Sequence, residues 1–387
     1  MFLKEIEGSP SLEMVNLVLQ KISEGKKVVS LAIGEPSFDT PPEIIKAASD
    51  AMSSGATRYV SSFGTRTVRE AIKRKVLRKN GIHAELPNVI FSSTKFSIYA
   101  ALMAISERKY DALIPDPGYF YAEPVVLSGG TPVRYRLADD YTLNLDEIKK
   151  KVTKATRAVI INTPSNPTGR VFGKSELKEL LAFCSEKGIA VLSDEAYEDL
   201  VYEKEHVSIG SMEKEPRTVV SIYSLSKSYS MTGWRAGYVV ANTGVIKLIN
   251  RFFENTLTCF PPFIQEASAY ALDNCDARIA EFRTELAKRR RALMEMVEGI
   301  DALEGNPIEG AFYAFPKCRM KMTSRDLSVR LLEEMNVALL PGTCFGPSGE
   351  SHVRISFSGS PGETKEGMKR LKEFLEARQA MPTRQSH

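Results

Sequence analysis

The chain has 387 residues, enough for one large domain that carries a smaller one. Hydrophobic residues make up 43% and charged residues 26% of it, the proportions of a globular enzyme with a sizeable core and not of a disordered or fibrous chain. The net charge of +4, from 52 basic and 48 acidic side chains, is too small and too scattered to indicate a nucleic-acid partner or an acidic membrane surface.

Signals for membranes, secretion and metals are weak. The longest apolar run, residues 98–105, is far shorter than the roughly 20 residues of a membrane span. The first residues lack the basic region and apolar run of a secretory signal, so we expect a cytoplasmic protein. The five cysteines are widely spaced and odd in number, and the four histidines have no ligand-like spacing, so we expect neither disulfides nor a metal site.

The first predicted element is a helix over residues 11–23. Its apolar side chains recur with helical spacing and would form one buried stripe. The stripe consists of Leu12, Val15, Leu19 and Ile22. We expect this helix to pack with the C-terminal part of the chain.

A second helix is predicted over residues 40–53. Thr40 is a suitable N-cap, Pro41 suits the first turn, and Glu43 can reach back as in a capping box. From here to about residue 275, apolar segments of strand length alternate with amphipathic segments of helix length, as in a sheet with helices on both faces.

The predicted strands are apolar on consecutive positions, which is typical of parallel strands covered on both faces. They span residues 88–91, 157–162, 189–193, 219–223 and 237–241. A helix over residues 174–187, ended by Gly188, connects two of them. We therefore predict an α/β fold whose large domain has a mostly parallel central sheet covered by helices.

After about residue 275 the pattern changes to long charged helices over 276–298, 324–335 and 362–378, with short strands such as 353–357. This pattern predicts a smaller α+β domain. We expect the large domain to span residues 40–275. The small domain would be built from both chain ends, residues 1–39 and 276–387, with residues 381–387 as a frayed tail.

The most informative segment, residues 224–237, follows an apolar strand and reads Ser-Leu-Ser-Lys-Ser-Tyr-Ser-Met-Thr-Gly-Trp-Arg-Ala-Gly. A lysine among small hydroxyl residues, eight positions before Arg235, suits a Schiff-base lysine, Lys227, beside a phosphate site. Ser224, Ser226 and Arg235 could hold the phosphate, with a bidentate contact from the arginine. The string resembles the lysine signature of the pyridoxal-phosphate-dependent aminotransferases of fold type I, the aspartate aminotransferase superfamily.

A second segment tests this resemblance independently. The strand 189–193 is followed by Asp194 and Tyr197, and the carboxyl end of a strand faces the crevice where open α/β sheets bind ligands. The resemblance implies that Asp194 pairs with the protonated pyridine nitrogen of the cofactor and that Tyr197 donates to its phenolic oxygen. A charged pyridinium lets the ring accept electrons from the substrate's α-carbon. The alternative is that Asp194 caps the next helix.

Five further positions match the family in order. Asn166, in Thr-Pro-Ser-Asn-Pro-Thr-Gly, would contact the phenolic oxygen and the substrate carboxylate, and Tyr119 would stack on the pyridine ring. Gly34 would let its backbone approach the substrate carboxylate, which Arg354, in an apolar strand, would bind. Tyr59 matches a tyrosine that reaches the phosphate in the neighbouring subunit, so the resemblance implies a homodimer.

The phosphate loop departs from the family, because Ser-Ser-Thr-Lys-Phe at residues 92–96 contains no glycine. The resemblance still assigns Ser93 and Thr94 to the phosphate. Lys95 matches a lysine that meets the distal carboxylate of acidic substrates in prokaryotic aspartate aminotransferases. The same lysine also occurs in relatives with other preferences.

Other classes fit less well. Residues 169–175 are one residue too short for a P-loop, and no G-x-G-x-x-G string for a nicotinamide cofactor occurs. We therefore predict an aminotransferase that uses pyridoxal phosphate to move the α-amino group of an L-amino acid to a 2-oxo acid, with aspartate or glutamate and 2-oxoglutarate as the favoured pair. A carbon–sulfur β-lyase is the nearest alternative, and a non-catalytic regulatory protein on the same fold is the alternative from a different class.

Overall fold

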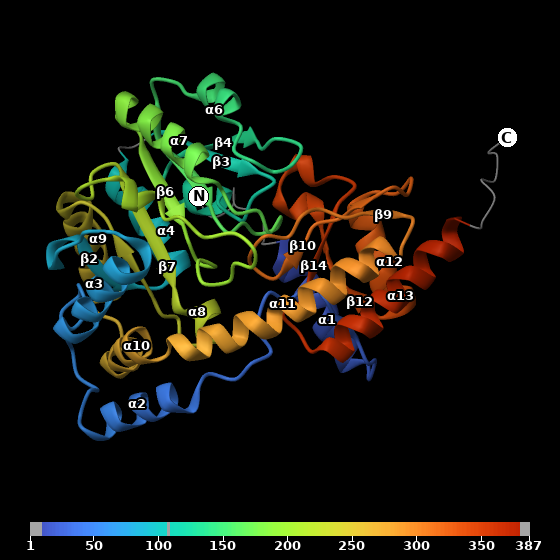
Figure 1. Ribbon diagram of the computed structural model, residues 1–387, viewed down its shortest axis with the longest axis horizontal. Coiled ribbons are helices and arrows are strands. Elements are labelled where there is room, and N and C mark those ends of the chain that lie inside the picture. Colours follow the sequence, from blue (N-terminus) through green and yellow to red (C-terminus); the bar gives the residue numbers. More distant parts are fainter. Residues whose placement is uncertain (1–9, 107–108, 380–387) are drawn as a thin grey trace.

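The computed structural model in Figure 1 describes residues 10–106 and 109–379. A seven-stranded sheet forms its centre, and only β8 runs antiparallel to its neighbours. The strands follow one another across the sheet in the order β2 (Val89–Ser92), β8 (Gly237–Val240), β7 (Val219–Ser224), β6 (Ala190–Asp194), β5 (Thr156–Asn162), β3 (Asp111–Asp116) and β4 (Thr131–Arg136). The predicted α/β fold with a mostly parallel sheet is confirmed.

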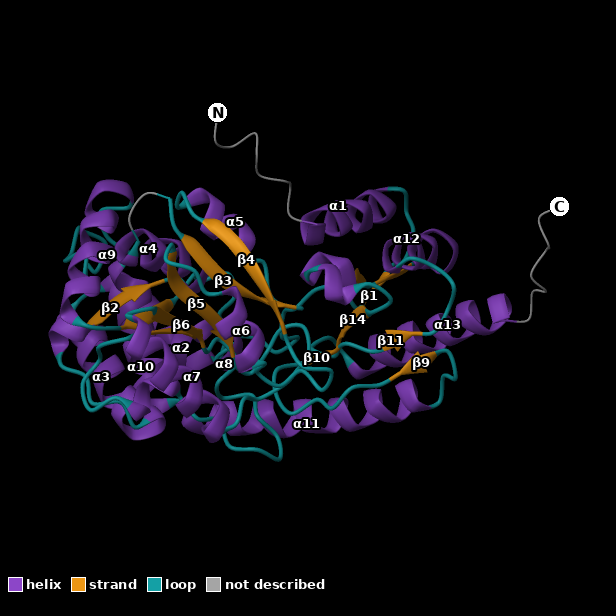
Figure 2. Ribbon diagram, turned by 90° about the horizontal axis from the view of Figure 1, so that it is seen from above, coloured by secondary structure: helices purple, strands orange, loops and turns teal. Residues whose placement is uncertain are grey.

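Helices lie on both faces of this sheet (Figure 2). They are α3 (Arg66–Asn80), α4 (Thr94–Ile105), α5 (Ala122–Leu127), α6 (Leu145–Lys151), α7 (Lys174–Lys187), α9 (Thr243–Thr256) and α10 (Pro262–Asn274). The predicted bounds of α7 are confirmed, and Gly188 ends it with a left-handed φ of 66° that suits a residue without Cβ. In the part of the chain that the structure describes, every helix is too short or too polar to span a lipid bilayer.

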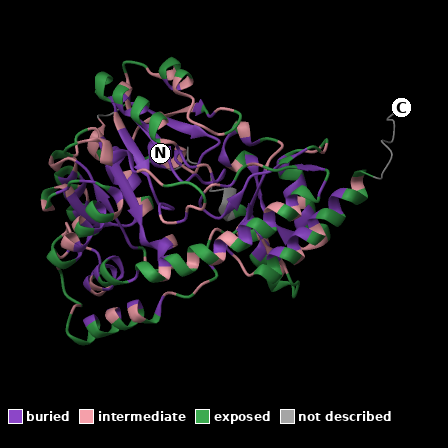
Figure 3. Cartoon of the chain, in the orientation of Figure 1, coloured by how far each residue is buried: buried purple, intermediate pink, exposed green. Residues whose placement is uncertain are grey.

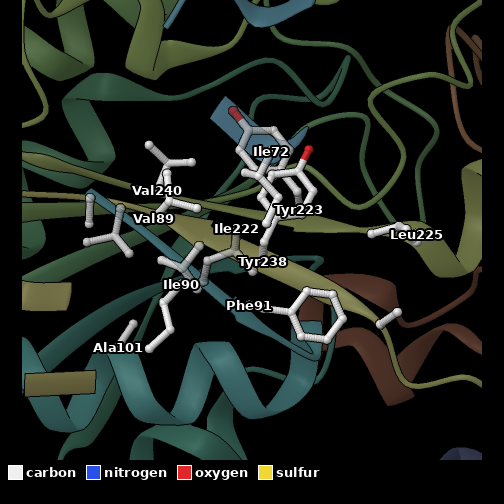
Figure 4. Packing of buried hydrophobic residues seen from close by; sticks show 14 of the residues in the cluster. Ile72, Val89, Ile90, Phe91, Ala101, Ile222, Tyr223, Leu225, Tyr238 and Val240 are labelled. Atoms are coloured by element: carbon white, nitrogen blue, oxygen red, sulfur yellow. The ribbon is translucent and has the colours of Figure 1, made fainter. Parts of the chain in front are cut away.

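The consecutive apolar residues of the strands are buried because helices cover both faces of the sheet. All four residues of β2 and all six of β7 are buried, and Figure 3 draws the central strands largely in the colour of buried residues. Figure 4 shows side chains from β2, β7 and β8 packed between helices, among them Ile90, Phe91, Ile222 and Tyr238. The resulting core fixes the strand ends that carry the site.

The second helix, α2 (Pro42–Ser53), begins later than predicted, and Thr40 does not cap it. The Thr40 hydroxyl donates instead to the carbonyl of Ser230, at 2.6 Å, and accepts from the Trp234 indole. The Glu43 carboxylate accepts from Arg278, which lies 235 positions later in α11 (Asp276–Glu298), so it forms no capping box. The predicted cap was wrong because contacts with distant residues use the side chains that a local cap would need.

The C-terminal part consists of α11 (Asp276–Glu298), α12 (Ser324–Met335) and α13 (Pro361–Gln379) around short strands. The antiparallel strands β10 (Tyr313–Ala314), β14 (Val353–Ser356) and β13 (Leu340–Pro341) form one sheet. Two smaller pairings join β9 (Leu303–Glu304) to β11 (Lys317–Cys318), and β1 (Val29–Ser30) to β12 (Val337–Ala338). The N-terminal segment thus pairs with the C-terminal part, while the domain boundaries at 39/40 and 275/276 stay a prediction. The tail predicted at 381–387 lies outside the described residues.

The N-terminal helix α1 (Pro10–Ser23) packs on the C-terminal part, but with a face other than the predicted stripe. Met14 and Val18 are buried against Leu332 and Phe345. Leu19 and Ile22 are 57% and 52% exposed, and the side chain of Leu12 lies outside what the structure describes. Helical spacing fits both faces of α1, so the tertiary partner decides which face is buried.

Candidate active site

A cavity of about 310 Å³ opens at the carboxyl ends of β5, β6 and β7. Residues from both ends of the chain complete its wall. Of the residues predicted for the site, those that line it are Gly34, Thr94, Lys95, Tyr119, Asn166, Asp194, Tyr197, Ser224, Ser226, Lys227, Arg235 and Arg354. The fold therefore brings together residues that are up to 320 positions apart in the sequence.

Lys227 lies on the single-turn helix α8 (Leu225–Ser228), directly after β7. The turn is held by the Ser224 hydroxyl, which accepts from the backbone N–H of Ser226 at 3.2 Å. The Lys227 ammonium donates to the carbonyl of Gly34 at 2.5 Å. Burial lowers the pKa of Lys227 to about 8; the negative charge of Glu35 opposes this shift, and the positive charges of Arg354 and Arg235 add to it. The unprotonated amine, which is the nucleophile, is therefore easier to form near neutral pH than at an exposed lysine.

Asp194 ends β6 and is 5% exposed. One carboxylate oxygen accepts from the Tyr121 hydroxyl at 2.8 Å, and the other accepts from the backbone N–H of Ala196 at 3.2 Å. Burial raises the pKa of Asp194 to about 6, against the effect of both hydrogen bonds. Residues 196–199 form a turn and not a helix, so Asp194 orders this turn and faces the cavity at the same time.

Arg354 projects from β14 and is 4% exposed. Its guanidinium donates to the Asn166 side-chain oxygen at 3.1 Å and to the carbonyl of Ala32, while its Nε has no hydrogen-bond partner. No acidic side chain pairs with it among the residues that the structure describes. A buried cation without an anion favours an anionic ligand, and a carboxylate fits the planar guanidinium.

The cavity lining also offers donors for a second anion. Thr94 and Lys95 form the first turn of α4, whose N–H groups lack partners within the helix. Ser224, Ser226 and Arg235 line the same cavity. Backbone amides at a helix N-terminus, hydroxyls and a guanidinium together make a phosphate-binding arrangement.

A glycine lies beside the phosphate loop on the neighbouring strand β8. A Cβ on Gly237 of β8 would lie 2.5 Å from the carbonyl of Tyr223 and 3.2 Å from the Thr94 hydroxyl oxygen. Residue 237 therefore has no room for a side chain, because β8 lies close to the backbone of β7 and to the first turn of α4 there.

With this geometry in place, comparison with known proteins decides the family. The sequence matches the family "Aminotransferase class I and II" over residues 26–371. The chain belongs to this family.

Relatives of this aminotransferase cover almost its whole length. It is 37% identical to an aspartate aminotransferase of Pyrococcus abyssi, over 90% of this chain and 92% of the relative, and 35% identical to aromatic-amino-acid aminotransferase 2 of Thermococcus litoralis, over 95% and 98%. A solved aspartate aminotransferase of Thermus thermophilus with maleate superimposes with a TM-score of 0.92 at 28% identity, over 96% of this chain and 98% of that one. The predicted aminotransferase function is confirmed, and the names of these relatives favour amino-group transfer over the β-lyase and regulatory alternatives.

Two predicted site residues of the aminotransferase do not line the cavity. Ser93 is the N-cap of α4, where its side chain makes no capping hydrogen bond. Tyr59 is 86% exposed, which is unusual for a large aromatic side chain. Tyr59 stays a prediction that concerns a second subunit.

Sequence reasoning missed several residues of this site. Tyr121 donates to Asp194, and Asn162 joins the backbones of Asp194 and Asn166 at 2.9 and 2.7 Å. Tyr313 lines the cavity and contacts Tyr197. The position of Asn162 at the end of a predicted strand was a usable signal, whereas Tyr121 and Tyr313 lie in segments that resemble ordinary core.

Proposed function

We propose that this cavity binds pyridoxal 5′-phosphate and that Lys227 is its covalent anchor. When bound, the cofactor supplies an aldehyde that condenses with amines and a pyridinium ring that draws electrons from an amino acid's α-carbon. One arrangement carries the proposal: a half-buried amine of lowered pKa faces the same cavity as a buried carboxylate and a buried guanidinium without an anion.

The donors around the cavity fit such a group. Ser224, Ser226, Arg235 and Thr94 would bind the phosphate together with the N-terminus of α4, to which Ser93 belongs as the N-cap. Asp194 would keep a proton on the ring nitrogen, since a neighbouring cation offsets the cost of its buried charge. Tyr197 and Asn166 would donate to the phenolic oxygen, and Tyr119 would stack on the ring.

The remaining residues bind the substrate and move its proton. Arg354 would bind the α-carboxylate, next to the backbone of Gly34, and so orient the α-carbon. Lys227, with its lowered pKa, would accept the proton from the α-carbon as a general base and return it to the other side of the transferred amino group. Because a 2-oxo acid can reverse these steps, the amino group passes from one acid to another.

The decisive experiment traps the anchor. Borohydride reduction of the protein incubated with pyridoxal phosphate should leave a pyridoxyl group on the peptide that contains Lys227, detected by mass spectrometry. Lys227→Ala should remove that adduct and abolish amino transfer, while Lys174→Ala, at an exposed helix start, should change neither. An adduct confined to another lysine contradicts the proposal, and pyruvate with ammonia from cystathionine, without transfer, would favour the β-lyase.

We propose acidic amino acids, aspartate or glutamate with 2-oxoglutarate, as the substrates. Lys95 lies on the cavity wall, is exposed and could pair with a distal carboxylate. The relative from Pyrococcus abyssi is named an aspartate aminotransferase, and the Thermus structure is named with maleate, which is a dicarboxylate. The aromatic-amino-acid relative indicates the competing preference.

We also propose a homodimer in which Tyr59 reaches the partner's phosphate site. Its exposed phenol ring supports this, because burial of such a ring at an interface is favourable. Tyr59→Ala and Lys227→Ala subunits should each be inactive, and hybrids formed by subunit exchange should regain activity in one of two sites. Verified hybrids that stay inactive would count against shared sites.

A further inference from the structure

Tyr313 of β10 contacts three of the proposed site residues at once. Its hydroxyl lies 2.9 Å from the Tyr197 hydroxyl, and its ring centroid lies 4.3 Å from the Arg354 guanidinium carbon. A Cβ at Gly34 would come within 2.0 Å of the same hydroxyl, so glycine at this position leaves room for Tyr313. Tyr313 is 1% exposed and lines the cavity.

Backbone pairing and ring packing fix this side chain. Tyr313 pairs with Ser356 in the antiparallel ladder between β10 and β14, and β14 carries Arg354. The ring of Tyr197 meets the rings of Tyr313 and Phe312 edge to face, at centroid distances of 5.7 and 5.4 Å. Edge-to-face contacts hold each ring in one orientation, so the two hydroxyls have little freedom to separate.

The direction of the hydrogen bond between the two hydroxyls matters. Each phenol has one proton to donate, so Tyr197 can donate into the cavity only if Tyr313 donates to Tyr197. Burial holds the pKa of Tyr197 well above its usual value, so Tyr197 keeps its proton at neutral pH. Among the described residues, the titratable and charged groups that act on Tyr197 include Tyr313, Tyr119, Tyr121 and Arg354.

We infer that Tyr313 is a positioning residue whose hydroxyl donates to the Tyr197 oxygen, so that Tyr197 donates its own proton into the cavity. This inference rests on the proposed function, in which the acceptor is the phenolic oxygen of pyridoxal phosphate. Donation by Tyr313 polarises the Tyr197 O–H bond and strengthens its donation. The ring of Tyr313 meanwhile supports the Arg354 guanidinium through its π face.

The test is Tyr313→Phe, which keeps the ring and removes the hydroxyl. Donation from Tyr197 favours the deprotonated phenolic oxygen of the cofactor, so weaker donation should raise the pKa read from the cofactor's visible absorbance. Because the donation from Tyr197 is weakened and not lost, the rise should be only a fraction of what one whole hydrogen bond would give, on the order of 0.1–0.3 of a pKa unit. The control is Tyr135→Phe, which removes an equally buried hydroxyl that donates to the carbonyl of Ile160 outside the cavity, and it should leave the titration unchanged.

A double-mutant cycle separates positioning from general damage. In a Tyr197→Phe background, Tyr313→Phe should produce no further shift in the absorbance pKa. The inference is overturned if Tyr313→Phe leaves the titration of the otherwise unaltered protein unchanged, or if the shift is equal in both backgrounds. If the unaltered protein shows no cofactor absorbance, the proposed function fails. Urea unfolding of the apoprotein then tests whether the Tyr313 and Tyr197 hydroxyls are coupled: non-additive changes in the unfolding midpoint support the coupling, and additive changes overturn it.

Discussion

The turn that follows β6, residues 195–199, has charged groups on two sides, and the two sides differ in how their charges are compensated. On the side away from the cavity, the ammonium of Lys75 bonds to the Glu198 carboxylate and, at 2.9 Å, to the Asn80 side-chain oxygen. Lys79 pairs with Asp199 at 3.2 Å. The Glu195 carboxylate is bonded by His206, Ser193 and Ser208, each at 2.9 Å.

On the cavity side, the charged groups meet only neutral partners. Asp194 accepts from a phenol and an amide, Lys227 donates to a carbonyl, and Arg354 donates to a side-chain amide and a carbonyl. Within residues 10–106 and 109–379, none of the three forms a salt bridge. Burial moves the pKa of Asp194 up and that of Lys227 down, which is what buried charges without counter-ions do.

The difference separates structural charges from functional ones. The paired charges on the side away from the cavity hold the turn in place, because residues 195–199 belong to no regular helix or strand. The unpaired charges on the cavity side raise the free energy of the folded protein without ligand, and a bound ligand with complementary charges would lower it again. Burial alone does not distinguish Glu198 from Asp194, whereas the presence of an opposite charge does.

The largest expected effect breaks the paired side. Lys75→Met leaves the Glu198 carboxylate buried without a cation, so the free energy of unfolding of the apoprotein should fall by about 3–5 kcal/mol. Urea unfolding measures this, and adding Glu198→Gln should recover most of the loss because both charges are then gone. Lys46→Met, at an exposed pair with Asp50, is the control and should cost less than about 1 kcal/mol. Equal costs for Lys75→Met and Lys46→Met would mean that the buried network does not hold the fold.

On the unpaired side, Asp194→Asn should affect activity and stability in opposite directions. Loss of the preorganised charge should cost about 3–4 kcal/mol of transition-state stabilisation, which is a fall in turnover of roughly two to three orders of magnitude. The same change should stabilise the apoprotein, because no buried carboxylate has to ionise. Near-normal turnover would reduce Asp194 to a residue that orders the turn.

The effect of Asp194→Asn on the free energy of unfolding should depend on pH. The folded pKa of Asp194 is raised from about 3.8 to about 6, so between these values the folded protein binds more protons than the unfolded chain. Its contribution to the free energy of unfolding therefore falls as pH rises through this window, and Asn lacks that contribution. In urea unfolding, the advantage of Asp194→Asn over the unaltered apoprotein should grow between pH 5 and pH 8, by an amount on the order of 1–2 kcal/mol. A pH-independent difference would contradict the unpaired charge.

The sequence predicts those parts of the fold and the site whose pattern lies within a single segment of the chain. Consecutive apolar residues predict β5, β6 and β7, and parallel strands end at one edge, so the polar residues after them converge. Lys227, Asp194 and Asn166 are therefore found together without a structure.

The rest depends on partners that are distant in the sequence. Tyr313 lies in an apolar run and acquires its role from Tyr197, which is 116 positions away. Lys75 resembles a solvated residue of a charged helix until Glu198 lies beside it. For α1, the buried face was wrong because Leu332 and Phe345 select Met14 and Val18. Local patterns carry no information about which distant residue compensates a charge or covers a face.

A last prediction sharpens the comparison at the edge of the cavity, where Lys95 is exposed and forms no ion pair among the described residues. Solvent compensates this charge when no ligand is bound, so removing it should hardly change stability. One charge-assisted contact with a distal carboxylate is worth about 1.5–3 kcal/mol, which corresponds to roughly ten- to a hundredfold in kcat/KM. Lys95→Ala should therefore weaken the use of aspartate or glutamate by that factor and leave alanine nearly unaffected, because alanine has no distal carboxylate.

Steady-state assays with a 2-oxo acid acceptor measure kcat/KM for aspartate or glutamate and for alanine, and the ratio of these values reports the preference for acidic donors. Lys174→Ala serves as the control, since this exposed lysine also begins a helix but does not line the cavity. Equal losses for all donors would assign Lys95 to the cofactor side of the site and leave acidic specificity without a cation in this wall. A loss confined to the acidic donors would support a substrate-selecting role for Lys95. The charges of the site would then divide further: a solvated charge at the edge of the cavity would select the substrate, and the unpaired charges inside it would perform the chemistry.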